Sequence, residues 1–200
     1  MKNRMSCVNN SVMDDTKKKI KDLPHIWVRK MATLLSATDL DGDGITSHDD
    51  VMTIAQRIVK SANLQGVASD NVRQSFREFA DGLKKADEDI LTKTWWEHTL
   101  QLWSGVDKAE VVKEMQAFYT KLFQALDFNS DGLISISEYM HWWKALGLDP
   151  SLGRLQFAYM DTDHDEKISA SEFVDAALDY EHNYTDCDTK NCFFGPLVDF

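Results

Sequence analysis

Residues 127–138 read DFNSDGLISISE, and this stretch decides how the rest of the chain is interpreted. Side chains that carry oxygen stand at its first, third and fifth positions, a glycine stands at the sixth, and a glutamate closes it. A hard divalent cation such as Ca²⁺ is held by about six to eight oxygens, which a twelve-residue loop supplies from positions 1, 3, 5, 7, 9 and 12. Glycine suits position 6 because the backbone turns sharply there. The stretch therefore predicts a cation-binding loop between two helices.

This is the pattern of the EF-hand loop, a specific short motif, and it occurs three times. Loop I is residues 39–50 (DLDGDGITSHDD), loop III is residues 127–138, and loop IV is residues 161–172 (DTDHDEKISASE). The predicted ligands, with a backbone carbonyl at position 7, are Asp39, Asp41, Asp43, Ile45 and Asp50; Asp127, Asn129, Asp131, Leu133 and Glu138; and Asp161, Asp163, Asp165, Lys167 and Glu172. Position 9 is occupied by Ser47, Ser135 and Ser169. One such loop alone could be a solvated acidic turn, but three loops between amphipathic helices argue against that interpretation.

Loops I and IV depart from the pattern. Loop IV has Glu166 at position 6, where a residue other than glycine is strained by about 1 kcal/mol, so we expect somewhat weaker binding than four carboxylates suggest. Loop I is closed by Asp50, which reaches about 1.5 Å less far than glutamate. Closure through one oxygen would leave a six-fold shell that suits Mg²⁺, unless the following helix moves inward. Ile134 and Ile168 stand at position 8 and are expected to pair as a short β-bridge.

A fourth loop position, slot II, lies between loops I and III and lacks the necessary ligands. With Leu91 aligned at position 8, Lys84, Ala86 and Glu88 fall at positions 1, 3 and 5, and Trp95 falls at position 12. Lysine and tryptophan cannot replace two carboxylates around a hard cation. We expect slot II to bind no ion and to be kept for packing.

Hydrophobic periodicity predicts a helix on each side of every loop. The expected apolar faces are Trp27, Met31, Leu34 and Leu35; Val51, Ile54, Ala55, Ile58 and Val59; Val72, Phe76, Phe79 and Leu83, after an N-cap at Ser69; Trp95, Trp96 and Trp103; Val111, Val112, Met115, Phe118, Tyr119, Leu122 and Phe123; Tyr139, Trp142, Trp143 and Leu146, ending at Gly147; Leu152, Leu155 and Tyr159, after Asp149-Pro150; and Phe173, Val174, Ala177 and Tyr180. These elements predict an all-α, compact EF-hand fold of four helix–loop–helix units in two packed pairs.

The predicted organisation has a body and two ends. Its parts are a flexible arm at residues 1–20, an N-terminal EF-hand pair at 21–105, a C-terminal pair at 106–182, and a tail at 183–200. The tail is expected to pack on the body through Phe193, Phe194, Leu197 and Phe200, because leaving such side chains exposed forfeits roughly 1.5–3 kcal/mol each.

Composition narrows the possible functions and partners. The 22 Lys and Arg against 33 Asp and Glu give a net charge of −11, which argues against nucleic acid or an anionic membrane as the main partner. No apolar run approaches the ~18 residues of a membrane span, and residues 1–10 do not resemble a signal peptide. The cysteines, Cys7, Cys187 and Cys192, favour a reducing compartment, although Cys187 and Cys192 could close a small loop if oxidised. We expect a cytoplasmic protein that is monomeric.

From roughly Leu23 onward the chain resembles the invertebrate sarcoplasmic calcium-binding proteins, with the related calexcitins and luciferin-binding proteins. The resemblance rests on a first loop closed by Asp50, a degenerate second loop followed by Trp95 and Trp96, and the ending CFFGPLV at residues 192–198. It implies a compact four-EF-hand fold with the tail packed into the body. It also implies a cytosolic calcium buffer whose sites accept Mg²⁺ as well as Ca²⁺.

Two alternatives to a buffer stay open. Calcium-triggered photoproteins share this architecture, but their chemistry needs a histidine in the exit helix of the last EF-hand, where this chain has Ala177. We therefore expect no enzyme activity, and a luciferin carrier is the remaining version of that alternative. A calcium sensor would open a methionine-rich groove to a protein target, whereas the eight methionines here are scattered.

Overall fold

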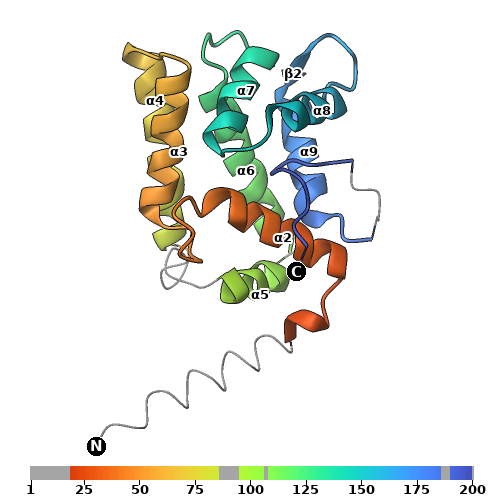
Figure 1. The fold of residues 1–200 in the computed structure, drawn as a ribbon. Helices are drawn as coiled ribbons and strands as arrows, with labels where there is room; N and C mark the ends of the chain where they lie inside the picture. The colour runs from red at the N-terminus through yellow and green to blue at the C-terminus, as the bar shows by residue number, and fades with distance from the viewer. Residues whose placement is uncertain (1–18, 86–94, 106–107, 186–189, 200) are drawn as a thin grey trace, which may run out of the picture.

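Helices build the body of the molecule, and in the part that the structure describes a single short strand pair joins two of the loops (Figure 1). The computed structural model describes residues 19–85, 95–105, 108–185 and 190–199. The helices are α2 (His25–Thr38), α3 (His48–Ser61), α4 (Gly66–Lys85), α5 (Trp95–Gly105), α6 (Ala109–Leu126), α7 (Ile136–Ala145), α8 (Pro150–Met160) and α9 (Ala170–His182), and the strands are β1 (Leu133–Ser135) and β2 (Lys167–Ser169). The prediction of an all-α fold is confirmed.

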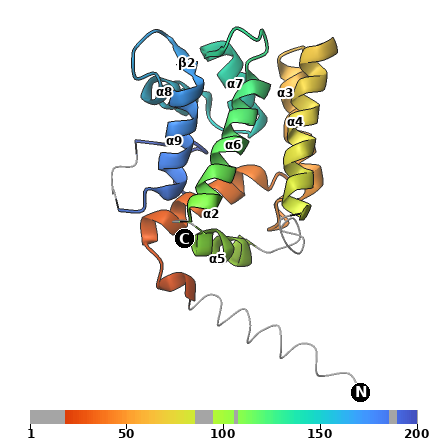
Figure 2. The same cartoon turned by 180° about the vertical axis from the view of Figure 1, so that it is seen from behind.

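The helices surround one shared core. α6 runs through the middle of the molecule with α4 on one side and α9 on the other, and α2 crosses near one end of this layer beside α5 (Figure 2). All five apolar residues predicted for α3 are buried, as are Trp27, Met31 and Leu35 of α2. Among the described helices, none is both long and apolar enough to cross a bilayer.

Each twelve-residue loop is bounded by two helix ends. The aspartate at position 1 caps the end of the entering helix, at Asp39, Asp127 and Asp161. The serine at position 9 starts the exit helix in a reciprocal capping box with the residue at position 12, through the pairs Ser47–Asp50, Ser135–Glu138 and Ser169–Glu172. The residues predicted to hold the ion therefore also fix where the helices stop and start.

Loops III and IV are joined by the β1–β2 pair. The strands are antiparallel, with Ile134 opposite Ile168, and both side chains are fully buried. The predicted β-bridge is confirmed.

The C-terminal tail packs into the core. The side chains of Phe193 and Phe194 are 0% and 6% exposed. The ring of Phe193 contacts Tyr119, Trp142 and Phe173, which come from three different helices. Burial of these two phenylalanines is confirmed, whereas Leu197 is only partly buried and Phe200 lies outside the described residues.

Beyond the phenylalanines the tail runs along α2. The guanidinium of Arg29 donates from Nε to the carbonyl of Val198 at 3.0 Å and from Nη2 to the carbonyl of Leu197 at 3.4 Å. It also pairs with Asp199 at 2.6 Å, and the amide of Val198 donates to the hydroxyl of Thr33 at 3.0 Å. The tail is thus tied to the entering helix of the first EF-hand.

Three sequence expectations are wrong. Ser69 is not an N-cap, because α4 begins at Gly66 and Ser69 is a buried residue inside the helix. The predicted face of α8 is wrong at two of its three residues: Leu152 is partly buried against the core, but Leu155 and Tyr159 are 68% and 39% exposed. That helix instead packs through Gly153, where a Cβ would meet Trp143 at 2.9 Å, and through Gln156, whose side chain bonds to the tail. The arm does not extend to residue 20, because Ile20 is 4% exposed and belongs to the core.

Other expectations fall on parts of the chain that the structure does not describe. These are the rest of the arm at residues 1–18, residues 86–94 of slot II, Cys187, and the side chains of Leu83, Lys84, Trp95 and Trp96.

We predict that replacing Phe193→Ala lowers the free energy of unfolding by about 3–5 kcal/mol, because the ring fills a closed site in the core. The matched control is Leu155→Ala, whose side chain is 68% exposed and whose loss should change stability by less than about 0.5 kcal/mol. Urea denaturation in the presence of chelator measures both. Equal losses in the two variants would contradict tail docking.

A buried carboxyl group, that of Glu181, lies beside Tyr119 in the core. Glu181 is 6% exposed, and the hydroxyl of Tyr119 donates to its Oε1. Burial raises the pKa of Glu181 to about 7, although the bond from Tyr119 acts to lower it. Burial and the nearby charge of Glu181 likewise raise the pKa of Tyr119.

We predict that Glu181 makes the protein less stable as the pH rises. Its pKa is raised in the folded chain, so its contribution is fully present below pH 4.5 and is lost as the pH rises towards about 7. Glu181→Gln should therefore be more stable than the parent at pH 8, by on the order of 1–3 kcal/mol, and nearly equal to it at pH 4.5. Denaturation in chelator at both pH values measures the difference. The exposed Glu110→Gln serves as the control and should show no such pH dependence.

Candidate metal centre

In all three loops the backbone folds around the carboxylate at position 1. Both oxygens of that aspartate accept backbone N–H groups, and the amide of position 6 donates to Oδ2 in every case. The donor–acceptor distances are 2.9 Å from Gly44 to Asp39, 2.9 Å from Gly132 to Asp127, and 3.1 Å from Glu166 to Asp161. The loop is therefore wrapped by its own hydrogen bonds, with the acidic side chains gathered at its centre.

The side chains at positions 3 and 5 each use one oxygen to hold the loop. The amide of position 5 donates to the oxygen of Asp41, Asn129 and Asp163 at 3.1, 2.9 and 3.2 Å. The amide of position 7 donates to Oδ1 of Asp43, Asp131 and Asp165 at 2.9, 3.0 and 2.8 Å. The loop backbone therefore leaves the second oxygen of each position-5 carboxylate unused.

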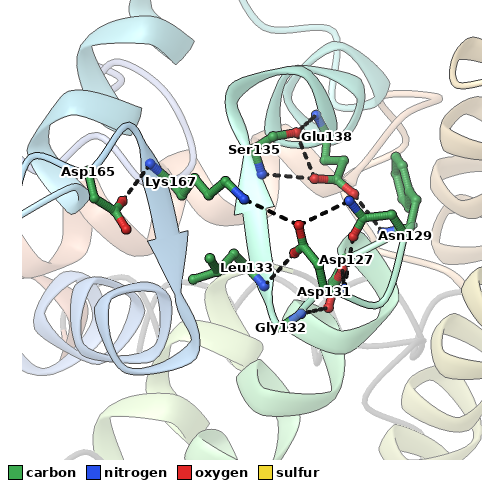
Figure 3. Close-up of polar contacts among 10 residues, drawn as sticks. Asp127, Asn129, Asp131, Gly132, Leu133, Ser135, Glu138, Asp165 and Lys167 are labelled. Atoms are coloured by element: carbon green, nitrogen blue, oxygen red, sulfur yellow. Dashed lines mark hydrogen bonds and ion pairs between the residues drawn. The ribbon is translucent and has the colours of Figure 1, made fainter.

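The carboxylate at position 12 closes each loop. One oxygen accepts the amide of position 2, at 3.0 Å for Leu40 to Asp50, 2.9 Å for Phe128 to Glu138, and 2.8 Å for Thr162 to Glu172. The other oxygen accepts the amide of the position-9 serine at 2.8 Å in all three loops. Figure 3 shows this arrangement in loop III.

Asp50 thus makes the same two closing bonds as the glutamates, although its side chain is shorter. Burial acts to raise the pKa of Asp50, but the bonds from Ser47 and Leu40 outweigh it and lower the pKa. The carboxylate is only 5% exposed, so it is held ionised in a largely buried position.

The acidic side chains lie close enough to share one cation. The carboxylates of Asp39, Asp41 and Asp43 lie within 4.8 Å of one another, and so do those of Asp161, Asp163 and Asp165. Loop III brings Asp127 and Asp131 around Asn129 in the same hydrogen-bonded frame.

The charges of loop I act on one another. A backbone bond from Asp43 acts to lower the pKa of Asp41, but burial and the charges of Asp43, Asp50 and Asp39 raise it overall. A divalent cation would remove that repulsion. The donor set consists of oxygens without sulfur, which fits a hard ion such as Ca²⁺ or Mg²⁺ rather than Zn²⁺. His48, which is in loop I at a non-ligand position, lies beside Asp49 and Asp81 instead.

Backbone strain occurs where it was expected and also at a second position. Glu166 has a φ of 66°, which is the left-handed conformation that Gly44 and Gly132 adopt at position 6. Position 4 is left-handed as well, at Ser130 and His164, which the sequence analysis missed. Gly42 at the same position of loop I was the available signal, because glycine is the usual residue in that conformation.

Comparison with known proteins places the chain among calcium-binding proteins. A family model described as an EF-hand domain pair matches residues 115–178. The luciferin-binding protein of Renilla reniformis is 28% identical over 180 residues, which are 86% of this chain and 94% of that protein. A sarcoplasmic calcium-binding protein of Hediste diversicolor is 31% identical over 180 residues, which are 86% of this chain and 99% of that protein.

A solved structure agrees with these sequence matches. The calcium-loaded apo form of coelenterazine-binding protein from Renilla muelleri matches with a TM-score of 0.73 and 26% identity, and the match covers 86% of this chain and 96% of that chain. The family resemblance expected from the motifs is confirmed.

We predict that Glu166→Gly is more stable than Glu166→Ala by about 1 kcal/mol, because only glycine adopts the left-handed conformation there without steric strain. Both variants remove the same charge, so the difference in their stability reports only the backbone strain at position 6. Thermal denaturation of the two variants in chelator measures it. If alanine is tolerated as well as glycine, position 6 of loop IV is not strained.

Proposed function

The chain belongs to the sarcoplasmic calcium-binding protein family of EF-hand proteins, and from that premise we propose that it is a cytoplasmic, monomeric calcium buffer with three sites. The sites would be loops I, III and IV, with the fifteen ligand residues that the loop pattern predicts. The proposal keeps the division into an N-terminal EF-hand pair at 21–105, a C-terminal pair at 106–182, and a tail that follows it.

The repeated hydrogen-bond frame is the observation that carries this proposal. Position 1 accepts the amide of position 6 in all three loops, and position 12 accepts the amides of positions 2 and 9. Such preorganisation lowers the entropy lost when an ion binds, because the ligands are already turned towards one centre. When bound, Ca²⁺ would neutralise two of the four ligand carboxylate charges of loop I or loop IV.

A buffer is favoured over a sensor because the two helical pairs are tied together through their exit helices. Arg57 of α3 donates to the carbonyl of Ala145 in α7 at 3.0 Å, and Ser61 of α3 lies 3.1 Å from Nδ1 of His141 in α7. Phe193 and Phe194 of the tail fill the interior where a sensor would receive its target. To open a groove for a target, the chain would have to break the contacts between α3 and α7 and move the tail phenylalanines out of the core.

Mg²⁺ is the second ion that we propose for these sites. Loop I is the candidate for the weakest discrimination between the two ions, since Asp50 has less freedom than glutamate to offer both oxygens to one ion. A shift of α3 towards the loop on ion binding would offset part of that effect.

A luciferin carrier is the second candidate function, and one feature of the core favours it. Aromatic rings from different parts of the chain adjoin one another, with ring centroids 4.9 Å apart for Trp27 and Trp103 and 5.2 Å apart for Trp103 and Tyr184. A planar aromatic ligand could stack among such rings. The names of the Renilla relatives fit this candidate, but Trp27 and Tyr119 are 1% exposed, so the rings would have to part to admit a ligand.

We predict a stoichiometry of three Ca²⁺ per chain in calorimetric titration. Asp50→Asn, Glu138→Gln and Glu172→Gln should each reduce it to two, because each removes the carboxylate that closes one loop. The matched control is Glu78→Gln, which alters an exposed ion pair with Lys121 and should leave three sites. A parent stoichiometry of one or four would overturn the assignment. Retention of coelenterazine by the chain would favour the carrier, and calcium-triggered light would favour a photoprotein.

A further inference from the structure

Lys167 contacts both loops of the C-terminal pair. Its amide donates to Oδ1 of Asp165 in loop IV at 2.8 Å, and its carbonyl is the predicted position-7 ligand of that loop. Its side chain crosses from β2 to loop III, where Nζ lies 3.3 Å from Oδ2 of Asp131 (Figure 3). The register that places Lys167 opposite Ser135 directs the side chain there.

The contact involves the one oxygen of Asp131 that the loop backbone does not use. Oδ1 of Asp131 accepts the amide of Leu133, while Oδ2 accepts both Lys167 and the side-chain amide of Asn129, the latter at 3.1 Å. Asp43 and Asp165 hold the same position in loops I and IV. Among the described residues, no side-chain donor reaches the second oxygen of either.

We propose that Lys167 sets the affinity of site III by acting as a tethered cation that competes for Asp131. The inference rests on the proposed function, because it concerns the ion that loop III would bind. A Ca²⁺ ion in loop III needs Oδ2 of Asp131 and has to displace the ammonium group to take it. The displaced ammonium stays attached to the neighbouring loop and repels the ion that replaced it.

Because of its charge balance, site III has the lowest calcium affinity of the three sites. Loop III has three ligand carboxylates, Asp127, Asp131 and Glu138, whereas loops I and IV have four each. Lys167 neutralises one of the three. Loop III has the most regular ligand pattern, yet it fills last.

The effect is modest because the pair is partly exposed. The side chains of Lys167 and Asp131 are 42% and 39% exposed, so solvent screens their interaction. We expect removal of the ammonium to tighten binding at site III by about two- to tenfold at low salt, and by less at high salt.

The test is a calcium titration of Lys167→Met followed by NMR, with one amide reporting on each loop. The amides of Gly44, Gly132 and Glu166 all donate to the position-1 aspartate, so each reports on its own site. Lys121→Met is the matched control, because it removes the same charge from an exposed ion pair that is also 3.3 Å long but involves Glu78, which is not a ligand. Titrating the calcium-loaded parent protein with chelator, and following the same three amides, gives the order in which the three sites bind calcium.

The expected result is that Lys167→Met moves the Gly132 midpoint to lower calcium, more than it moves that of Glu166, while Gly44 is unaffected. The shift should shrink when KCl is raised. An unchanged Gly132 midpoint, an equal shift in Lys121→Met, or a larger shift at Glu166 would overturn the role of Lys167. Failure of the proposed function would look different, since none of the three amides of the parent would then respond to calcium.

Discussion

The carboxylate at position 12 is the group on which each helix–loop–helix unit depends. Glu138 accepts the amide of Phe128 at the start of the loop and the amide of Ser135 at its end, and it also completes the capping box of α7. One side chain therefore closes the loop and begins the helix, and it is also the proposed position-12 ligand of site III. Any change in its position moves α7, which carries Tyr139, Trp142 and Trp143 into the core.

The core connects the loops to one another. Trp142 lies against Phe173 of α9 and against both tail phenylalanines, so the exit helices of loops III and IV share aromatic contacts. The β1–β2 pair joins the same two loops on their other side. A displacement at one loop is resisted by the other through two separate routes, which is consistent with the proposed buffer.

Much of the fold could be predicted from the sequence because loop spacing and apolar periodicity agree. The loops fix the helix ends through Asp39, Ser47 and their equivalents, and the faces of α3 and α7 followed the expected pattern. The face of α8 followed it only at Leu152, because Gly153 has to lie against Trp143 and Gln156 has to reach the tail, and neither requirement appears as hydrophobic periodicity. The contact of Lys167 with Asp131 was not predicted, because the expected Ile134–Ile168 bridge fixes the strand register but not the path of the long Lys167 side chain to Asp131.

The docking of the tail on α2 has a consequence for how the chain folds during synthesis. α2 is held by partners that follow it by more than 150 residues: Trp27 donates to the carbonyl of Glu181, Lys30 to that of Asn183, and Thr33 receives the amide of Val198. Contacts so distant in sequence form late, because the intervening chain has to be ordered first. While residues 181–199 are still inside the ribosome, the first EF-hand lacks the surface that covers its entering helix. Its apolar face is then open to chaperones or to other nascent chains until translation has passed the tail.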